Sequence, residues 1–166
     1  MKIGVISDTH MPKQAKQLPS HLLAGLNGVD LIIHAGDWTT LDVYHQLSSI
    51  APVKGVYGNV DPSEIKESFQ SQLLLTILGK KIGVTHGHLG KKKTTPERAM
   101  DAFTSTHVDI VLFGHSHIPY HEKIGNTILF NPGSPTDKRF QPRYSYGILT
   151  IENEVTINHI FYNDKN

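Results

Sequence analysis

The sequence contains no cysteine, which excludes disulfide bonds and metal sites built from thiolates. It also lacks any run that approaches ~20 consecutive apolar residues, the length that a membrane-spanning helix needs. The apolar stretch near the N-terminus is too short for a secretion signal and is interrupted by Asp8. We therefore expect a cytoplasmic protein with no membrane partner.

An excess of charge of either sign is also missing. The chain carries 16 basic and 15 acidic side chains, which gives a formal net charge of +1. Proteins that bind nucleic acids non-specifically show a basic footprint, and Lys91–Lys93 is the one run of that kind. The balance gives no strong signal for a nucleic-acid partner, and the sequence does not determine the oligomeric state.

The 166 residues suit one domain, residues 1–166, because no linker or internal repeat divides them. Short apolar runs rich in β-branched residues predict strands. The predicted strands are Ile3–Ser7, Val29–Ala35, Val53–Tyr57, Leu73–Leu78, Ile82–Thr85, Asp109–Phe113, Tyr120–Lys123, Thr127–Phe130, Tyr146–Ile151 and Val155–Phe161. Helices are predicted at Pro19–Leu26, after a cap at Thr39 or Thr40, and from Thr94 onwards.

Two local details complete the predicted fold. A turn at Gly79–Lys81 joins two of the strands into a hairpin. The helix after Thr40 is expected to pack through one face, which comprises Leu41, Tyr44, Leu47 and Ser48. Strands alternate with helices in the first half, and strands dominate the second. We therefore predict an α/β protein in which two mixed β-sheets pack as a sandwich with flanking helices.

The 11 histidines show where the chemistry lies. Five predicted strands each end in a short turn that carries metal-ligand side chains. These turns are Asp8-Thr9-His10, Gly36-Asp37, Gly58-Asn59, Thr85-His86-Gly87 and Gly114-His115-Ser116-His117. Ligands of open α/β sheets bind outside the carboxyl ends of the strands, so these turns are able to converge. Residues i and i+2 of an extended strand face the same way, which pairs Asp8 with His10 and His115 with His117.

The side chains of these turns offer oxygen and imidazole nitrogen but no sulfur. Such a set suits Mn²⁺, Fe²⁺, Ni²⁺, Co²⁺ or Zn²⁺ better than Ca²⁺ or Mg²⁺, which prefer oxygen ligands. Seven ligands are too many for one ion and fit two ions about 3.5–4 Å apart. The sequence therefore predicts a centre of two divalent metal ions, with Mn²⁺ as the favoured metal.

In this order the five blocks resemble the calcineurin-like metallophosphoesterase superfamily. The short chain and the Asn131-Pro132-Gly133-Ser134 block resemble its small prokaryotic phosphodiesterase branch, and the likeness extends from Lys2 to about Pro135. The resemblance implies two mixed sheets flanked by helices. It also implies that one metal is held by Asp8, His10 and His117, and the other by Asn59, His86 and His115. Asp37 would bridge the two, and we assign catalysis to Asp37, Asn59 and His86.

These features predict a hydrolase of phosphoric esters in which a hydroxide between the metals attacks phosphorus in line. Many relatives carry a histidine after the Gly-Asn pair, where this chain has Val60. Valine donates no proton to a leaving group, which favours small phosphodiester substrates whose leaving group departs unaided. Cyclic nucleotides, other nucleotide diesters and nucleic-acid ends all stay open as substrates.

Three alternatives accompany this hypothesis. A non-catalytic scaffold has the same fold in a eukaryotic retromer subunit, but such a scaffold has no need of all seven ligand positions. His88 either lines the substrate pocket or is merely exposed in its loop. His34 is expected to be a buried, hydrogen-bonded residue beside the site rather than a ligand.

Overall fold

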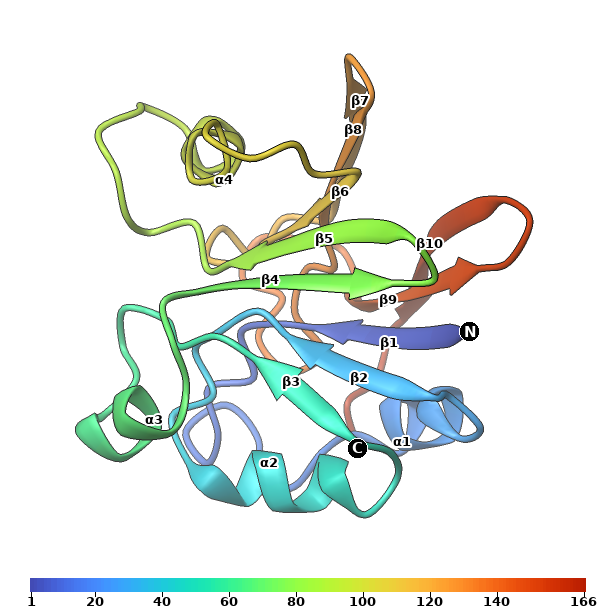
Figure 1. Cartoon of the computed structure of the whole chain (residues 1–166). Helices are drawn as coiled ribbons and strands as arrows, with labels where there is room; N and C mark the ends of the chain where they lie inside the picture. Colours follow the sequence, from blue (N-terminus) through green and yellow to red (C-terminus); the bar gives the residue numbers. More distant parts are fainter.

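The computed structural model describes all residues from Met1 to Asn166, and two five-stranded β-sheets form its centre (Figure 1). The first sheet has the order β10-β9-β1-β2-β3. Its strands are β1 (Lys2–Ile6), β2 (Leu31–His34), β3 (Val53–Gly55), β9 (Tyr144–Ile151) and β10 (Val155–Tyr162). The second sheet has the order β4-β5-β6-β8-β7. Its strands are β4 (Gln72–Ile77), β5 (Lys80–Thr85), β6 (Ile110–Leu112), β7 (Tyr120–Ile124) and β8 (Thr127–Asn131).

Both sheets are mixed. Strands β1, β2 and β3 are parallel, and β9 and β10 add to them in antiparallel fashion. In the second sheet β5, β6 and β8 are parallel, and β4 and β7 are antiparallel edge strands. Figure 1 shows β1, β2, β3, β5 and β6 running toward the same side of the molecule. The carboxyl ends of five strands therefore meet there, as the predicted site requires.

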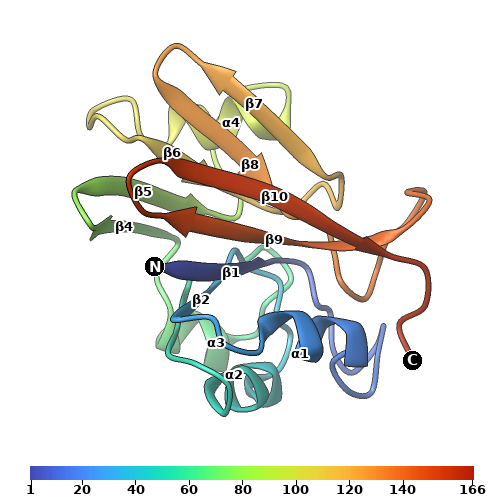
Figure 2. The same cartoon turned by 90° about the vertical axis from the view of Figure 1, so that its right-hand side faces the viewer.

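Three apolar clusters hold the layers together. One lies between the sheets and includes Ile3, Ile33 and Leu112. A second lies under α1 (Ser20–Leu26) and α2 (Leu41–Ser48) on the outer face of the first sheet. The third packs α4 (Thr95–Asp101) on the second sheet, and Figure 2 shows α4 on the far side from α1 and α2. The predicted sandwich with flanking helices is thus confirmed.

Polar side chains start two helices where the sequence predicts. Thr40 accepts a hydrogen bond from the Asp42 amide at 3.2 Å at the start of α2. Thr94 and Glu97 form a reciprocal capping box at the start of α4. The predicted face of α2 is only partly correct, because Val43 is buried with Leu47 while Leu41 and Tyr44 lie at its edge.

Other details differ from the prediction. The hairpin turn is Leu78-Gly79, with φ of 48° and 78°, and Lys80 already belongs to β5. A two-residue turn with both φ values positive matches the twist of the flanking strands. The sequence also missed α3 (Ser63–Ser68), a short helix that buries only Ile65. No helix is long and apolar enough to cross a membrane.

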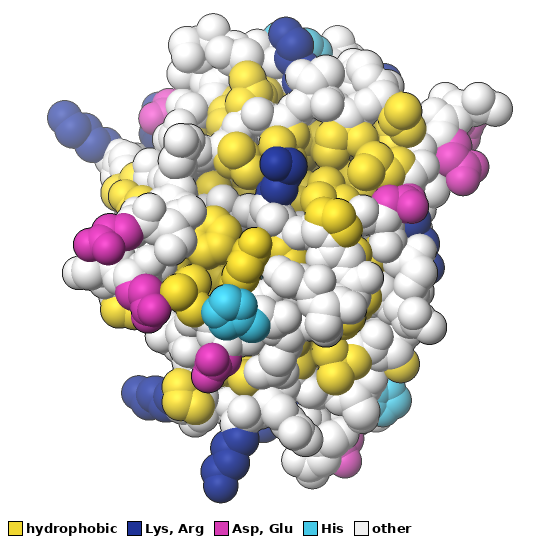
Figure 3. Space-filling view, turned by 60° about the horizontal axis from the view of Figure 1, so that its bottom comes forward, with side chains coloured by type: hydrophobic (Ala, Val, Ile, Leu, Met, Phe, Trp, Pro, Cys, Tyr) yellow, Lys and Arg dark blue, Asp and Glu magenta, His cyan; other side chains and the backbone are white.

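An apolar groove marks the lower surface of the molecule. It lies between α2, β3 and the start of β4, encloses about 510 Å³ and is lined in part by Leu41, Val53 and Phe69. Figure 3 brings this side forward and shows hydrophobic side chains gathered across its centre.

Candidate metal centre

The turns after five strands bring the seven predicted ligand side chains close together. They follow β1, β2, β3, β5 and β6, and they are Asp8, His10, Asp37, Asn59, His86, His115 and His117. Backbone hydrogen bonds join the turns, since the Asp8 amide donates to the Gly36 carbonyl at 2.9 Å and the Gly114 amide to the His86 carbonyl at 3.1 Å. The geometry decides which of the side chains are able to share an ion.

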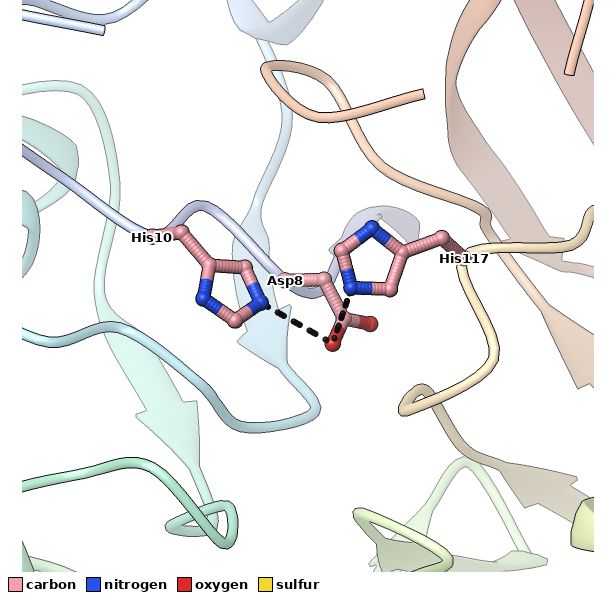
Figure 4. Close-up of side chains that lie close together, drawn as sticks. All are labelled: Asp8, His10 and His117. Carbon is pink, nitrogen blue, oxygen red and sulfur yellow. Dashed lines mark ion pairs between the residues drawn. The ribbon is translucent and has the colours of Figure 1, made fainter. Parts of the chain in front are cut away.

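One group consists of Asp8, His10 and His117 (Figure 4). The Oδ1 atom of Asp8 lies 3.6 Å from Nε2 of His10 and 3.4 Å from Nε2 of His117. The two imidazole rings stack with their centroids 5.0 Å apart. One carboxylate oxygen and two ring nitrogens thus face a common point.

A second group consists of Asp8, Asp37 and His86. Nε2 of His86 lies 3.1 Å from Oδ2 of Asp37 and 3.8 Å from Oδ1 of Asp8. The same Asp37 oxygen lies 3.5 Å from Nε2 of His10, which belongs to the first group. Asp37 of the second group thus also approaches the first, and Asp8 belongs to both groups.

Asn59 and His115 flank the second group rather than joining it. Their side chains contact each other, with His115 Nδ1 and Asn59 Oδ1 3.0 Å apart. The His115 ring lies 5.2 Å from the His86 ring, and the His115 amide donates to Asp8 Oδ2 at 3.0 Å. Asn59 is exposed and His115, like His10, is partly buried, whereas the other four predicted ligands are buried.

The residues fit a metal centre by one further test. Five buried polar atoms have no hydrogen-bond partner, and four of them converge at this centre, namely Asp8 Oδ1, His10 Nε2, His86 Nε2 and His117 Nε2. Buried polar atoms are nearly always paired, because an unpaired one costs about 1–3 kcal/mol. The Asp8 Oδ1 atom lies 3.4–3.8 Å from each of the three histidine nitrogens. Converging unpaired oxygen and nitrogen atoms are the arrangement that a divalent cation completes.

Backbone carbonyls orient two of these imidazoles. The Nδ1 atom of His86 lies 2.7 Å from the Ala35 carbonyl, and that of His117 lies 2.6 Å from the Asp137 carbonyl. A carbonyl only accepts, so each Nδ1 carries the proton and donates it. When such a ring is neutral, its lone pair is then on Nε2, which points to the centre.

The ionisable groups of the centre shift one another's pKa. Burial alone would lower the pKa of His86, but the Asp8 and Asp37 carboxylates raise it to about 9. Burial would raise the pKa of Asp8, yet the surrounding histidines hold it well below its usual range. The two buried carboxylates thus attract positive charge, which protons or metal ions are able to supply.

Strained backbone concentrates at this centre. Asp8, His10, Asp37, His115 and His117 all have positive φ, between 44° and 71°, although none is glycine. Such conformations cost about 1–3 kcal/mol each and occur at functional sites. The extended backbone that we predicted for these pairs is therefore wrong. As a result His117 belongs to the first group, whereas His115 lies beside His86.

His34 and Trp38 lie behind the centre. The buried His34 ring accepts from the Gly36 amide at 3.2 Å, lies 3.1 Å from Thr9 Oγ1 and stacks on Trp38. Burial lowers the pKa of His34 to about 3, so the ring is neutral. This confirms His34 as a buried, hydrogen-bonded neighbour of the site, and the fully buried Trp38 is a packing residue.

The Asn131–Ser134 block supports the metal-binding turns from the other side. The Asn131 amide nitrogen donates to the Gly114 carbonyl at 2.8 Å, and the Ser134 hydroxyl donates to the Asp8 carbonyl at 2.7 Å. The block therefore has a structural role beside the site. The neighbouring Thr136 hydroxyl, which the sequence did not single out, donates to the Thr9 carbonyl at 2.6 Å.

Asp61 supports the candidate site, a role that the sequence analysis missed. It lies two positions after Asn59. Its buried carboxylate accepts hydrogen bonds from the backbone amides of Asp37 at 2.9 Å, Thr39 at 2.7 Å and Gly58 at 2.7 Å. It thereby holds the turn of Asp37 against the turn that carries Asn59.

Asp61→Asn is expected to reduce metal content and thermal stability, because an amide has one acceptor oxygen instead of two. At least one buried amide then loses its partner, which costs about 1–3 kcal/mol. Melting temperature and metal content are the measurements. Asp30→Asn is the matched control, since Asp30 accepts from the Lys2 amide at an exposed position. Equal effects in both variants would contradict the positioning role of Asp61.

His88 lies at the edge of the centre. It is half-buried, its ring lies 5.3 Å from that of His86, and its Nδ1 atom has no hydrogen-bond partner. Burial and the nearby His86 lower the pKa of His88 to about 4. A neutral imidazole whose Nδ1 atom is buried without a partner thus lies beside the predicted ligands.

Comparison with known proteins identifies the family. The profile of the calcineurin-like phosphoesterase superfamily domain matches residues 1–154. The chain belongs to this superfamily. It is 35% identical to a protein named "Probable metallophosphoesterase" from Methanothermobacter thermautotrophicus, over 93% of this chain and 88% of that protein. It is also 27% identical to "Phosphodiesterase MJ0936" of Methanocaldococcus jannaschii, over 80% of this chain and 83% of the other.

Solved structures confirm the fold of the superfamily in this member. Wild-type Vps29 from Entamoeba histolytica superposes with a TM-score of 0.79 at 24% identity, over 97% of this chain and 99% of the other. At that identity the likeness establishes the fold alone. Together with the family, the two groups of candidate ligands support a metal-dependent phosphoesterase.

Proposed function

We propose that this phosphoesterase is a phosphodiesterase that uses two metal ions and acts on small phosphodiesters. The observation that carries the proposal is the set of four buried, unpaired ligand atoms at the ends of the strands. The name of the relative MJ0936 supports hydrolysis of diesters.

Each predicted ligand has a place in this proposal. Asp8, His10 and His117 would hold one ion, and Asn59, His86 and His115 the other. Asp37 would touch both, since its Oδ2 atom lies within 3.5 Å of a histidine from each set. When bound, two divalent ions lower the pKa of a coordinated water towards ~7 and neutralise charge on the phosphoryl oxygens, which supplies the nucleophile for in-line attack. The mixed nitrogen and oxygen ligands favour Mn²⁺ over Mg²⁺.

The residues around the centre select the substrate. Asp37, Asn59 and His86 are the side chains to which we assign catalysis, through the positions that they give the ions. His88 is the half-buried residue at the edge of the centre to which we assign, from its position beside His86, contact with a substrate. Val60, which is 49% exposed, lies beside Asp37 through a hydrogen bond of 3.1 Å from its amide to Asp37 Oδ1. A leaving group near Val60 receives no proton from it.

A comparison of diesters with monoesters tests this function. The metal-loaded protein is expected to hydrolyse bis(p-nitrophenyl) phosphate faster than p-nitrophenyl phosphate, because the dianionic monoester brings more charge to be neutralised. Initial rates at matched concentrations give kcat/KM for each. Faster turnover of the monoester would exclude the diester preference, and failure to hydrolyse either would exclude the function.

Val60→His is expected to accelerate substrates with poor leaving groups about 10- to 100-fold and those with good leaving groups little. A positioned general acid contributes about 10²-fold or more, and only an unstable leaving group needs its proton. Rates for a series of aryl diesters, plotted against leaving-group pKa, should be steep in wild type and flatter in the variant. Val60→Gln is the control without an acid. A flat plot for wild type would mean that another residue, with His88 first in line, already donates the proton.

A non-catalytic scaffold is the second candidate function, and the apolar groove beside α2 and β3 favours it. A scaffold has no use for seven ligand side chains, whereas the groove alone is sufficient for docking a partner. Metal-dependent hydrolysis of a phosphodiester separates the two, since a scaffold turns over no substrate.

A further inference from the structure

A phenylalanine lies entirely in solvent beside the candidate metal centre. Phe140 is 101% exposed, the most exposed large hydrophobic side chain of the protein. The next in exposure is Leu78, at 67%, on the hairpin turn between β4 and β5. Leaving an aromatic ring in water forgoes a large favourable contribution from burial, which makes Phe140 a candidate for contact with a ligand.

The turn that presents Phe140 is held in one conformation. The Gln141 amide donates to the Lys138 carbonyl at 2.8 Å, and the Lys138 ammonium donates back to the Gln141 carbonyl at 3.2 Å. Arg139, at the first central position, has a φ of 48°. Two hydrogen bonds across a four-residue turn fix its tip, where Arg139 and Phe140 stand.

The base of this turn is attached to the metal centre. Asp137 immediately precedes it, and the Asp137 carbonyl accepts the hydrogen bond from His117 Nδ1 at 2.6 Å. The Asp137 amide in turn donates to Ser134 Oγ at 2.8 Å. Phe140 follows Asp137 by three positions, so its backbone lies at most ~10 Å from that of Asp137. The ring is thus within a few nucleotide lengths of the candidate ligands.

Lysine side chains that have no carboxylate partner surround the turn. Lys138 and Lys165 place their ammonium nitrogens 5.8 Å and 5.6 Å from the same Tyr144 ring. Lys165 also bonds the carbonyls of Gln14 and Thr136, which ties the turn to a groove of about 630 Å³. Lys13, Lys16 and Lys165 line that groove and no acidic residue does. All seven ion pairs in the structure involve histidine, so no lysine or arginine has a carboxylate partner.

We infer that residues 138–141 and the adjoining basic groove bind single-stranded nucleic acid, with a base stacked on Phe140 and phosphates along the lysines. A basic groove that follows the phosphates, combined with an exposed aromatic ring outside it, is the arrangement that binds single strands without reading their sequence. The inference rests on the proposed function and narrows its substrate to oligonucleotide diesters. A duplex is disfavoured because no helix or paired strand presents these cations to a groove of DNA.

A binding experiment that needs no turnover tests this inference. The full chain, kept in chelator, is titrated into fluorescein-labelled oligothymidylate of about eight nucleotides, and anisotropy gives Kd. Phe140→Ala should weaken binding about tenfold, as loss of one stacked base does. An abasic strand of equal length and charge should bind wild type and Phe140→Ala alike. Phe140→Trp should restore affinity, and Leu78→Ala, which removes another exposed apolar side chain, should leave it unchanged.

The salt dependence of Kd tests the cations. Arg139→Gln should reduce the slope of log Kd against log salt concentration by ~0.7, the value for one phosphate contact of a single strand. Lys123→Gln, a substitution on β7 away from the turn, should leave the slope as in wild type. An unchanged slope in Arg139→Gln would overturn the assignment of phosphates to this turn.

Parallel measurements separate the failure of this inference from failure of the proposed function. Wild-type hydrolysis of bis(p-nitrophenyl) phosphate is measured with metal restored. Hydrolysis without oligonucleotide binding overturns the inference and leaves the function standing, whereas binding without hydrolysis does the reverse. Equal affinity of Phe140→Ala and wild type for the base-bearing strand overturns the stacking role. A wild-type oligomer that Phe140→Ala converts to monomer also overturns it, because the ring then contacts a second copy.

Discussion

Asp37→Ala is expected to lower kcat for an activated diester at least ~100-fold, which corresponds to about 2.7 kcal/mol or more of transition-state stabilisation. The reason is that Asp37 approaches a histidine of each group of ligands. Its Oδ2 atom lies 3.5 Å from His10 and 3.1 Å from His86, so its removal affects both ions. His10→Ala removes one ligand from one ion and should cost less.

The measurement combines rates with elemental analysis. Asp37→Ala should bind fewer than two metal equivalents, and its circular dichroism should show that the fold is kept. Asp42→Ala is the control, because Asp42 is an exposed carboxylate on α2. Full metal occupancy and a normal rate in Asp37→Ala would mean that Asp37 is only a turn residue.

The fold follows largely from local patterns in the sequence. Buried parallel strands such as β1 and β2 are continuous apolar runs, which makes them easy to recognise. Capping residues such as Thr40 and Thr94 are also local signals. The short helix α3 escaped prediction because its six residues bury a single side chain, Ile65, and so show no helical period. Tertiary contacts rather than sequence pattern determine such elements.

The candidate site was predictable in its residues but not in its backbone. The ligands stand out because their side chains are unusual after apolar strands. The positive φ of Asp8 and His115 has no signal in the sequence, since neither residue is glycine. The supporting contacts were equally hidden. The carbonyls of Ala35 and Asp137, which orient two histidines, belong to residues whose identity does not matter to the bond.

Overall charge balance also concealed a local feature. A net charge of +1 argues against nucleic-acid binding when charges are counted over the whole chain. Folding, however, places Lys13, Lys16 and Lys165 around one groove, although Lys165 lies about 150 residues from the other two in sequence. Lys91–Lys93, the one basic run, lies instead in an exposed loop whose carbonyls accept from Arg98. Local charge therefore has to be assessed on the folded molecule.

Removal of metal is expected to abolish hydrolysis, by ~10³-fold or more, because the proposed nucleophile is a water molecule that the ions activate. Without ions, Asp8 and Asp37 hold protonated histidines, as the raised pKa of His86 indicates. That state neither activates water nor neutralises a phosphoryl group, contributions worth several kcal/mol.

The protein is stripped with chelator, its metal content is checked, and each divalent ion is restored in turn. Mn²⁺ should restore the highest rate and Ca²⁺ almost none, because imidazole nitrogen suits the former. Saturating metal should also raise the melting temperature, since an ion at 100 times its Kd adds about 2.7 kcal/mol to stability. Loss of activity without this thermal shift would place the required metal elsewhere, and a stripped protein of undiminished rate would refute the mechanism.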